Sequence, residues 1–172
     1  MHDTRLANLL GATVLAVNDL MLTRIREVGT VGTSGAGALV TLATAPGIGV
    51  SEVGRRVGVT QSAAVRMVDG LERAGLVRRT RASGRVVGVE LTEAGRRAAE
   101  RILTARAEAL RDLVSGLDER ERRELTGLTT KLLTRLHGTA GDSNRLCRLC
   151  DRVCCTDNAV CPVGQAERDA RE

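Results

Sequence analysis

The sequence contains no phenylalanine, tyrosine or tryptophan, and Lys131 is its only lysine. Without aromatic rings, the protein cannot bind nucleic-acid bases by stacking them on an aromatic platform. Its core must be built from leucine, valine, alanine, isoleucine and methionine. No uninterrupted apolar run approaches the about 20 residues that a membrane span needs, and no secretion signal precedes the first amphipathic stretch. We therefore expect a cytoplasmic protein that neither spans a membrane nor is secreted.

Positive charge is concentrated in one part of the chain. The 172 residues include 26 basic and 21 acidic ones, which gives a formal net charge of +5. Residues 51–97 hold ten arginines and five acids, so this segment alone accounts for the whole excess. A basic surface of this kind favours a polyanionic partner. The length suits one domain with a small appendage.

The spacing of apolar residues predicts a mainly helical chain with one β-hairpin. Helical periodicity alternates with two basic segments of period two, which are typical of strands. Ser51, Thr60 and Thr92 are placed to cap helices, and Asp118 with Glu121 to form a capping box. The expected helices cover residues 6–28, 33–45, 52–57, 61–74, 93–115 and 119–137, and the expected strands cover 76–81 and 86–91.

Two short helices joined by Gly58-Val59 and followed at once by a basic hairpin are typical of a winged helix-turn-helix, whose second helix enters the major groove of DNA. Val65, Val68 and Leu71 repeat at helical spacing, so we expect them to face the core. The opposite face presents polar groups for bases and phosphates, and the arginines of the hairpin suit a narrow minor groove. The predicted DNA-binding residues are Ser51, Thr60, Gln61, Ser62, Ala63, Arg66, Arg78, Arg79, Arg81 and Arg85.

Three stretches resemble the MarR family of bacterial transcription regulators: Val50–Ala63, Leu71–Arg79 and Glu90–Gly95. The resemblance extends over about residues 5–137. It implies a mainly α fold: a winged helix-turn-helix domain with a β-hairpin wing, and long N- and C-terminal dimerisation helices that form a homodimer. Such a dimer would bind double-stranded DNA at a pseudo-palindromic operator whose half-sites lie about 34 Å apart, one DNA turn.

This resemblance divides the chain into four segments. Residues 1–32 form the N-terminal dimerisation helix, 33–97 the winged DNA-binding domain, 98–140 the C-terminal dimerisation helices, and 141–172 a cysteine-rich tail beyond the resemblance. The family usually carries Asp-x-Arg or Asp-Arg-Arg in the wing, whereas this chain has Ser83-Gly84-Arg85. The resemblance therefore implies a minor-groove role for Arg85, without the acidic residue and the first arginine.

All five cysteines lie within 15 residues of the tail. In a chain without a secretion signal, such a cluster favours a metal or cofactor site over a disulfide framework. Only one Cys-x2-Cys pair is present, where zinc sites often use two, and Cys161-Pro162 is similar to the end of ferredoxin-type cluster motifs. We expect an iron–sulfur cluster of undetermined type, with structural zinc or metal-free redox thiols as alternatives. The expected ligands are Cys147, Cys150, Cys154 and Cys161, with Cys155 as the alternative to Cys154.

The sequence thus predicts a homodimeric, sequence-specific transcriptional repressor whose DNA affinity changes when its cluster is lost, oxidised or nitrosylated. The alternative is a regulator of the same type with a structural zinc site and a small-molecule signal. We expect no enzyme, because the chain has no Gly-rich nucleotide loop, nucleophile–base set or paired carboxylates. Non-specific DNA compaction is a further alternative, since phosphate contacts alone would support it.

Overall fold

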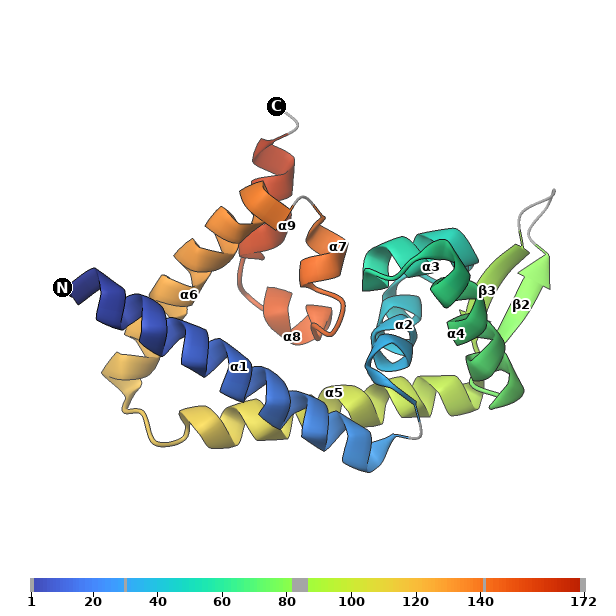
Figure 1. Cartoon of the computed structure of the whole chain (residues 1–172), viewed down its shortest axis with the longest axis horizontal. Helices are drawn as coiled ribbons and strands as arrows, with labels where there is room; N and C mark the ends of the chain where they lie inside the picture. Colours follow the sequence, from blue (N-terminus) through green and yellow to red (C-terminus); the bar gives the residue numbers. More distant parts are fainter. Residues whose placement is uncertain (1, 30, 82–86, 141, 171–172) are drawn as a thin grey trace.

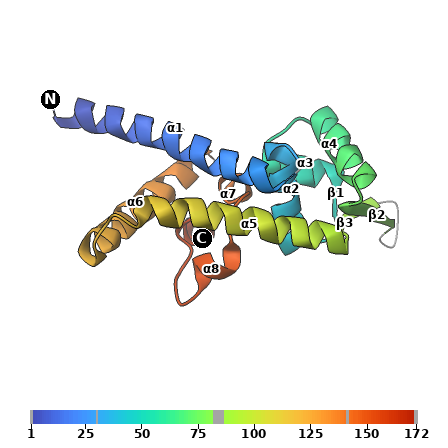
Figure 2. The same cartoon turned by 90° about the horizontal axis from the view of Figure 1, so that it is seen from below.

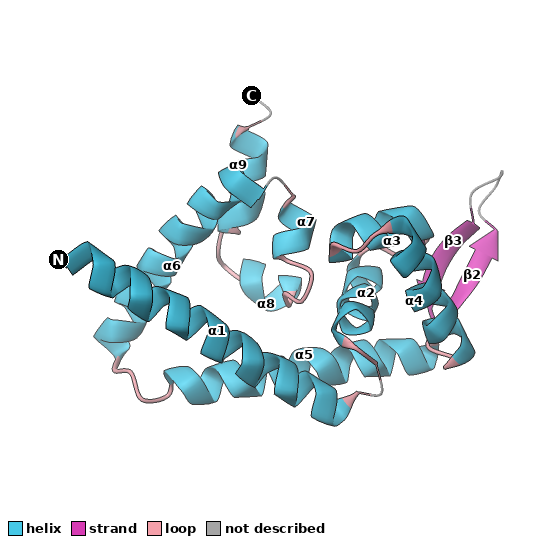
Figure 3. Cartoon of the chain, viewed as in Figure 1, coloured by secondary structure: helices cyan, strands magenta, loops and turns pink. Residues whose placement is uncertain are grey.

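The computed structural model describes residues 2–29, 31–81, 87–140 and 142–170. Helices dominate this part of the chain, and one small sheet lies at its edge (Figure 3). The helices are α1 (His2–Val28), α2 (Thr33–Thr44), α3 (Val50–Val57), α4 (Gln61–Arg73), α5 (Glu93–Val114), α6 (Glu119–Ala140), α7 (Ser143–Leu146), α8 (Arg152–Thr156) and α9 (Pro162–Asp169), and the strands are β1 (Ile48–Gly49), β2 (Val77–Arg81) and β3 (Val87–Leu91).

The chain forms a winged unit at one end and an arrangement of long helices at the other (Figure 1). The winged unit consists of α2, α3, α4 and the sheet. Helix α5 connects the two parts, because it packs on α2 within the winged unit and on α1 outside it. Figure 2 shows α1 and α5 running side by side. The predicted fold class, a mainly α winged helix-turn-helix, is confirmed.

The sheet is antiparallel with the strand order β1-β3-β2. Both predicted hairpin strands are confirmed: β2 begins one residue later than predicted, and both strands end at the predicted residue. Strand β1 was not predicted from the sequence. Its two residues pair with β3 through Gly49 and Gly88. A Cβ atom on Gly88 would lie 2.5 Å from the carbonyl oxygen of Gly47, so this close approach requires glycine.

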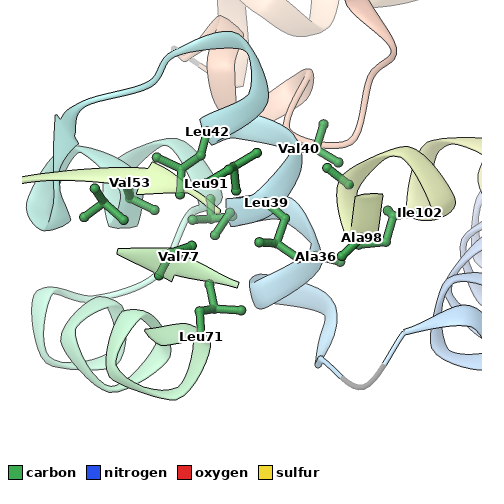
Figure 4. Packing of buried hydrophobic residues seen from close by; sticks show 14 of the residues in the cluster. Ala36, Leu39, Val40, Leu42, Val53, Leu71, Val77, Leu91, Ala98 and Ile102 are labelled. Carbon is green, nitrogen blue, oxygen red and sulfur yellow. The ribbon is translucent and has the colours of Figure 1, made fainter. Parts of the chain in front are cut away.

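The core of the winged unit consists of aliphatic side chains from every one of its elements (Figure 4). Leu39 and Leu42 of α2 are almost fully buried, and Val53, Val68 and Val89 join them from α3, α4 and β3. Ile102 of α5 extends this core toward the long helices. The apolar interior is therefore continuous between the winged unit and the long helices.

Thr60, Thr92 and Asp118 cap helices α4, α5 and α6, as the sequence predicted. Thr92 accepts the N–H of Gly95 at 3.0 Å, and Asp118 and Glu121 form the reciprocal capping box. The prediction that Ser51 caps a helix is wrong, because α3 begins one residue before it at Val50 and has Gly49 at the cap position. Ser51 instead lies exposed in the first turn of α3.

The buried face of α4 differs by one residue from the prediction. Ala64, Val68 and Leu71 are buried, whereas Val65 is 39% exposed. Positions 64, 68 and 71 follow the spacing of an α-helix more closely than 65, 68 and 71, because a helix turns once in about 3.6 residues. The small side chain at position 64 also allows α3 to approach, since a Cβ on Gly54 would lie 2.6 Å from that of Ala64.

Long apolar faces remain exposed on α1 and α6 in the single chain. Helix α6 carries a stripe of exposed leucines, and α1 carries a comparable set of exposed apolar residues. Contrary to the sequence expectation, α1 is long and apolar enough, by length and composition alone, to cross a membrane. The large exposed apolar residues are Leu6, Leu9, Leu10, Val14, Leu15, Leu20 and Val28 of α1 and Leu125, Leu128, Leu132, Leu133 and Leu136 of α6.

The cysteine-rich tail folds back into the space between the long helices and the winged unit (Figure 1). Helix α9 packs on α6, and α7 packs on α3. The connection from the long helices to the tail is short, because α6 continues to Ala140 and α7 begins at Ser143. The tail therefore contacts both parts of the molecule.

Candidate functional site

The first turn of α4 presents polar side chains to solvent. Thr60 caps this helix, because its hydroxyl accepts the N–H of Ala63 at 3.3 Å, and the hydroxyl of Ser62 lies 3.4 Å from it. Gln61, Ser62 and Arg66 are exposed, and Ala63 is half-buried. The N-terminal end of a helix carries a partial positive charge, which adds to the charge of Arg66. This surface has the hydrogen-bonding groups that DNA recognition requires.

The wing adds an exposed arginine on the face of the sheet that points away from the core. Arg78 of β2 lies opposite Glu90 of β3, and its Nη2 atom is 3.0 Å from Oε2 of that glutamate. An exposed pair of this kind contributes about 0–1 kcal/mol, so a phosphate can replace the carboxylate at little cost. The tip of the wing, which includes Arg85, lies outside the described residues, as does the side chain of Arg81.

Arg79 has a different role from the predicted one. Its Nη2 atom bonds Oδ1 of Asp69 at 2.5 Å, and its Nη1 atom pairs with Glu72. The hydrogen bond that Arg79 donates to Asp69 is the main cause that raises the pKa of Arg79. Because two carboxylates of α4 neutralise this guanidinium, we correct its assignment from a DNA contact to a brace between β2 and α4.

Four of the five cysteines face one another inside the tail. Cys147 interacts with Cys150, Cys150 with Cys155, and Cys155 with Cys161. Two neighbouring cavities, one of about 220 Å³ and the other of about 400 Å³, are lined by these same four side chains. Cys154 lines neither cavity; it is exposed and interacts with Asp151. The sequence favoured Cys154 over Cys155 as a ligand, and the structure brings Cys155 to the other three instead.

Burial and the contacts between thiols shift the pKa values of the cysteines. Interaction with Cys150 lowers the pKa of Cys147, and the same interaction raises the pKa of Cys150. Burial raises the pKa of Cys155 to about 11. The sulfur of Cys161 accepts the N–H of Gly164 at 3.4 Å, so Cys161 caps α9.

A guanidinium faces the cysteines from the long helices. Arg106 of α5 lines the smaller cavity together with Cys147, Cys150, Cys155 and Cys161. Its Nε atom is buried and has no hydrogen-bond partner among the described residues. Within the described part of the chain, His, Cys, Asp and Glu side chains form no group of three or more that is already spaced to hold a metal ion. Metal binding would therefore require the free thiols to turn toward a common centre.

The tail also contacts the helix-turn-helix directly. Leu149 is 7% exposed and belongs to the core of the winged unit. Arg145 lies over the turn between α3 and α4, where a Cβ atom on Gly58 would be 3.0 Å from its Nε atom. Arg55 of α3 pairs with Asp142, which caps α7. These contacts connect the cysteines to the element that positions α4.

The fold and these surfaces define a winged helix-turn-helix protein with a cysteine-rich appendage. The sequence profile described as the MarR family matches residues 37–85. YusO from Bacillus subtilis is 30% identical with a TM-score of 0.65, over 77% of this chain and 93% of that chain. A MarR-family transcriptional regulator from Silicibacter pomeroyi is 27% identical with a TM-score of 0.56, over 74% of this chain and 86% of that chain. The chain belongs to the MarR family.

A third similar structure contains DNA. It is a MarR-family protein from Mycobacterium tuberculosis in complex with DNA, 23% identical with a TM-score of 0.57, over 72% of this chain and 96% of that chain. No curated protein sequence matches the chain. The family profile ends well before the tail.

Sequence reasoning missed two residues of the candidate site. Arg106 lies on the buried face of α5, at helical spacing from Ile102 and Ala109, but an arginine carries no apolar signal and was therefore not singled out. Leu149 is an apolar residue between two cysteines of a tail without apolar periodicity. A helix-capping pattern was available in the tail, since Asp142, Asp151 and Cys161 each cap the helix that follows.

Proposed function

We propose that the protein is a sequence-specific DNA-binding transcriptional repressor that acts as a homodimer. The observation that carries this proposal is the exposed N-terminal part of α4, with Gln61, Ser62 and Arg66, which is followed along the chain by the arginine-bearing wing. The exposed leucine stripe of α6 and the apolar face of α1 provide the surfaces that a second copy would cover. In a dimer, the two α4 helices would bind half-sites about 34 Å apart.

Arg66→Ala is expected to weaken binding to the operator by about 10- to 100-fold, because a bidentate arginine contact to a guanine is worth about 1–3 kcal/mol. The operator is first selected from random duplex DNA, and affinities are then measured by fluorescence anisotropy with labelled duplexes at about 150 mM salt. Arg120→Ala is the matched control, since it removes the same charge from an exposed position on α6, far from the winged unit.

The same experiment tests specificity and dimer binding. Scrambling one half-site of the operator should weaken binding strongly, because only one of the two α4 helices of the dimer then meets its specific half-site. Equal affinity for the operator, the half-scrambled duplex and random DNA would contradict sequence-specific regulation and favour non-specific compaction.

For the tail, we propose an iron–sulfur cluster whose binding and loss control DNA affinity. Four thiols that face common cavities support the proposal, because soft thiolates suit iron–sulfur clusters and zinc. The contacts of Arg145, Leu149 and Asp142 with the helix-turn-helix offer a route to α4. A coupling free energy of about 2 kcal/mol would change DNA affinity about 30-fold.

Anaerobic purification tests this proposal for the tail. The expected result is a coloured protein with bound iron and acid-labile sulfide, absorbing at roughly 320–420 nm, whose operator affinity changes after the iron is removed by a chelator. A colourless protein with one zinc ion per chain would contradict the cluster. It would instead favour a structural zinc site and a small-molecule signal.

A further inference from the structure

We infer that the metal centre of the tail is held by Cys147, Cys150, Cys155 and Cys161, that Cys154 takes no part, and that Arg106 balances its charge. This inference rests on the proposed cluster of the tail and names its ligands and its charge partner. It does not depend on DNA binding.

The ligand set follows from the direction in which each cysteine faces. The four proposed ligands form a continuous series of contacting side chains and line both cavities of the tail. Cys154 and Cys155 are neighbours in α8, and successive residues of a helix point about 100° apart. When Cys155 faces the other thiols, Cys154 therefore faces away, and it is exposed at the surface.

The spacing of the four proposed ligands allows one centre to be closed by short segments. Cys147 and Cys150 are three residues apart just after α7, Cys155 lies near the end of α8, and Cys161 directly precedes α9. Short loops of this kind are closed at low entropic cost. A cavity of about 220 Å³ beside the thiols also exceeds the space that one metal ion needs, since a water molecule takes about 30 Å³.

Arg106 has the position and charge of a partner for this centre. Four thiolates around a zinc ion or a cluster leave a net negative charge, which needs compensation where water is partly excluded. Arg106 lines the cavity and interacts electrostatically with Cys150. Its buried Nε–H has no acceptor among the described residues, and a thiolate or sulfide of the centre would provide one.

The neighbouring cysteines provide a matched pair of variants. Cys155→Ser is expected to abolish iron binding and visible absorption after anaerobic reconstitution with iron and sulfide, whereas Cys154→Ser is expected to retain both. Circular dichroism and the melting temperature show whether each variant is folded. Retention of the centre in Cys155→Ser, or its loss in Cys154→Ser, would overturn the ligand set.

Arg106 is tested by how firmly the centre is held. Arg106→Gln is expected to accelerate the loss of iron to a chelator by about 10-fold, the effect typical of a residue that hydrogen-bonds a metal ligand. Arg106→Lys should restore most of the retention, because it keeps the charge. Equal rates in the wild-type protein and Arg106→Gln would overturn the role of Arg106.

The outcome separates this inference from the proposal on which it rests. If zinc is bound, and Cys155→Ser loses it while Cys154→Ser keeps it, the ligand set stands and the iron–sulfur cluster falls. If reconstituted wild-type protein binds neither iron nor zinc, both fall. The operator measurements decide the DNA-binding function independently of either result.

Discussion

Gly95→Ala is expected to lower the free energy of unfolding by about 3 kcal/mol or more. For a chain of this length, the melting temperature should fall by about 6–12 °C. Gly95 lies in the first turn of α5, where a Cβ atom would overlap the carbonyl oxygen of Leu76. That oxygen already accepts the N–H of Thr92 at 3.0 Å, so the surrounding backbone cannot shift without breaking the junction between α5 and the sheet. Thermal unfolding followed by far-UV circular dichroism measures the effect.

Gly70→Ala is the control for this substitution. Gly70 lies inside α4, and a Cβ atom there would meet nothing within 4 Å. Alanine in a helix interior is favoured over glycine by about 0.5–1 kcal/mol, so this variant should be slightly more stable than the wild-type protein. Equal melting temperatures for the two variants would show that the contact between Gly95 and Leu76 is not close.

Leu149→Ala is expected to release the tail from the winged unit. Truncating a buried leucine costs about 2–5 kcal/mol. In α7–α9 and their connections, the buried apolar residues are Leu149 and Val163, so the loss of Leu149 removes much of the apolar contact that holds the tail. Undocking of the tail therefore requires less free energy than unfolding of the whole chain. Limited digestion with trypsin measures the release, because cleavage after Arg145, Arg148 or Arg152 requires local unfolding of the backbone, which the docked tail resists.

Val153→Ala serves as the control for the tail, because Val153 is 79% exposed and its truncation should leave the digestion pattern unchanged. If the tail controls α4 through its docking, Leu149→Ala should also bind the operator with the affinity of wild-type protein from which iron has been removed. Resistance to trypsin equal to that of the wild-type protein would contradict the docking of the tail by Leu149.

Local signals in the sequence are sufficient to predict most of the winged unit. The caps at Thr60 and Thr92 and the change of period at the hairpin each depend on neighbouring residues, and the structure confirms them. Strand β1 consists of two residues, too few for a period, and its pairing depends on Gly88, where a Cβ atom would lie 2.5 Å from the carbonyl oxygen of Gly47. The one-residue error at Val65 arose because alanine is a weak hydrophobic signal, although Ala64 is fully buried.

The site was less predictable because its contacts join segments far apart in the chain. Arg79 and Arg78 look alike in sequence, and only the fold shows that Arg79 lies beneath Asp69 and Glu72 while Arg78 is exposed. Cys154 and Cys155 are likewise equivalent in spacing until the direction of α8 is known. Long-range packing, rather than local preference, decides which member of each pair faces the site.

The aliphatic core described above makes the protein almost transparent in the near ultraviolet. With no tryptophan or tyrosine in the chain, absorption above 250 nm and intrinsic fluorescence would come almost entirely from groups bound to the cysteines or from DNA. A single tryptophan introduced in place of Val153, which is exposed on α8 beside the cysteines, would therefore be the only fluorophore of the chain. Its emission would report the state of the tail in the intact complex with DNA, without any external label.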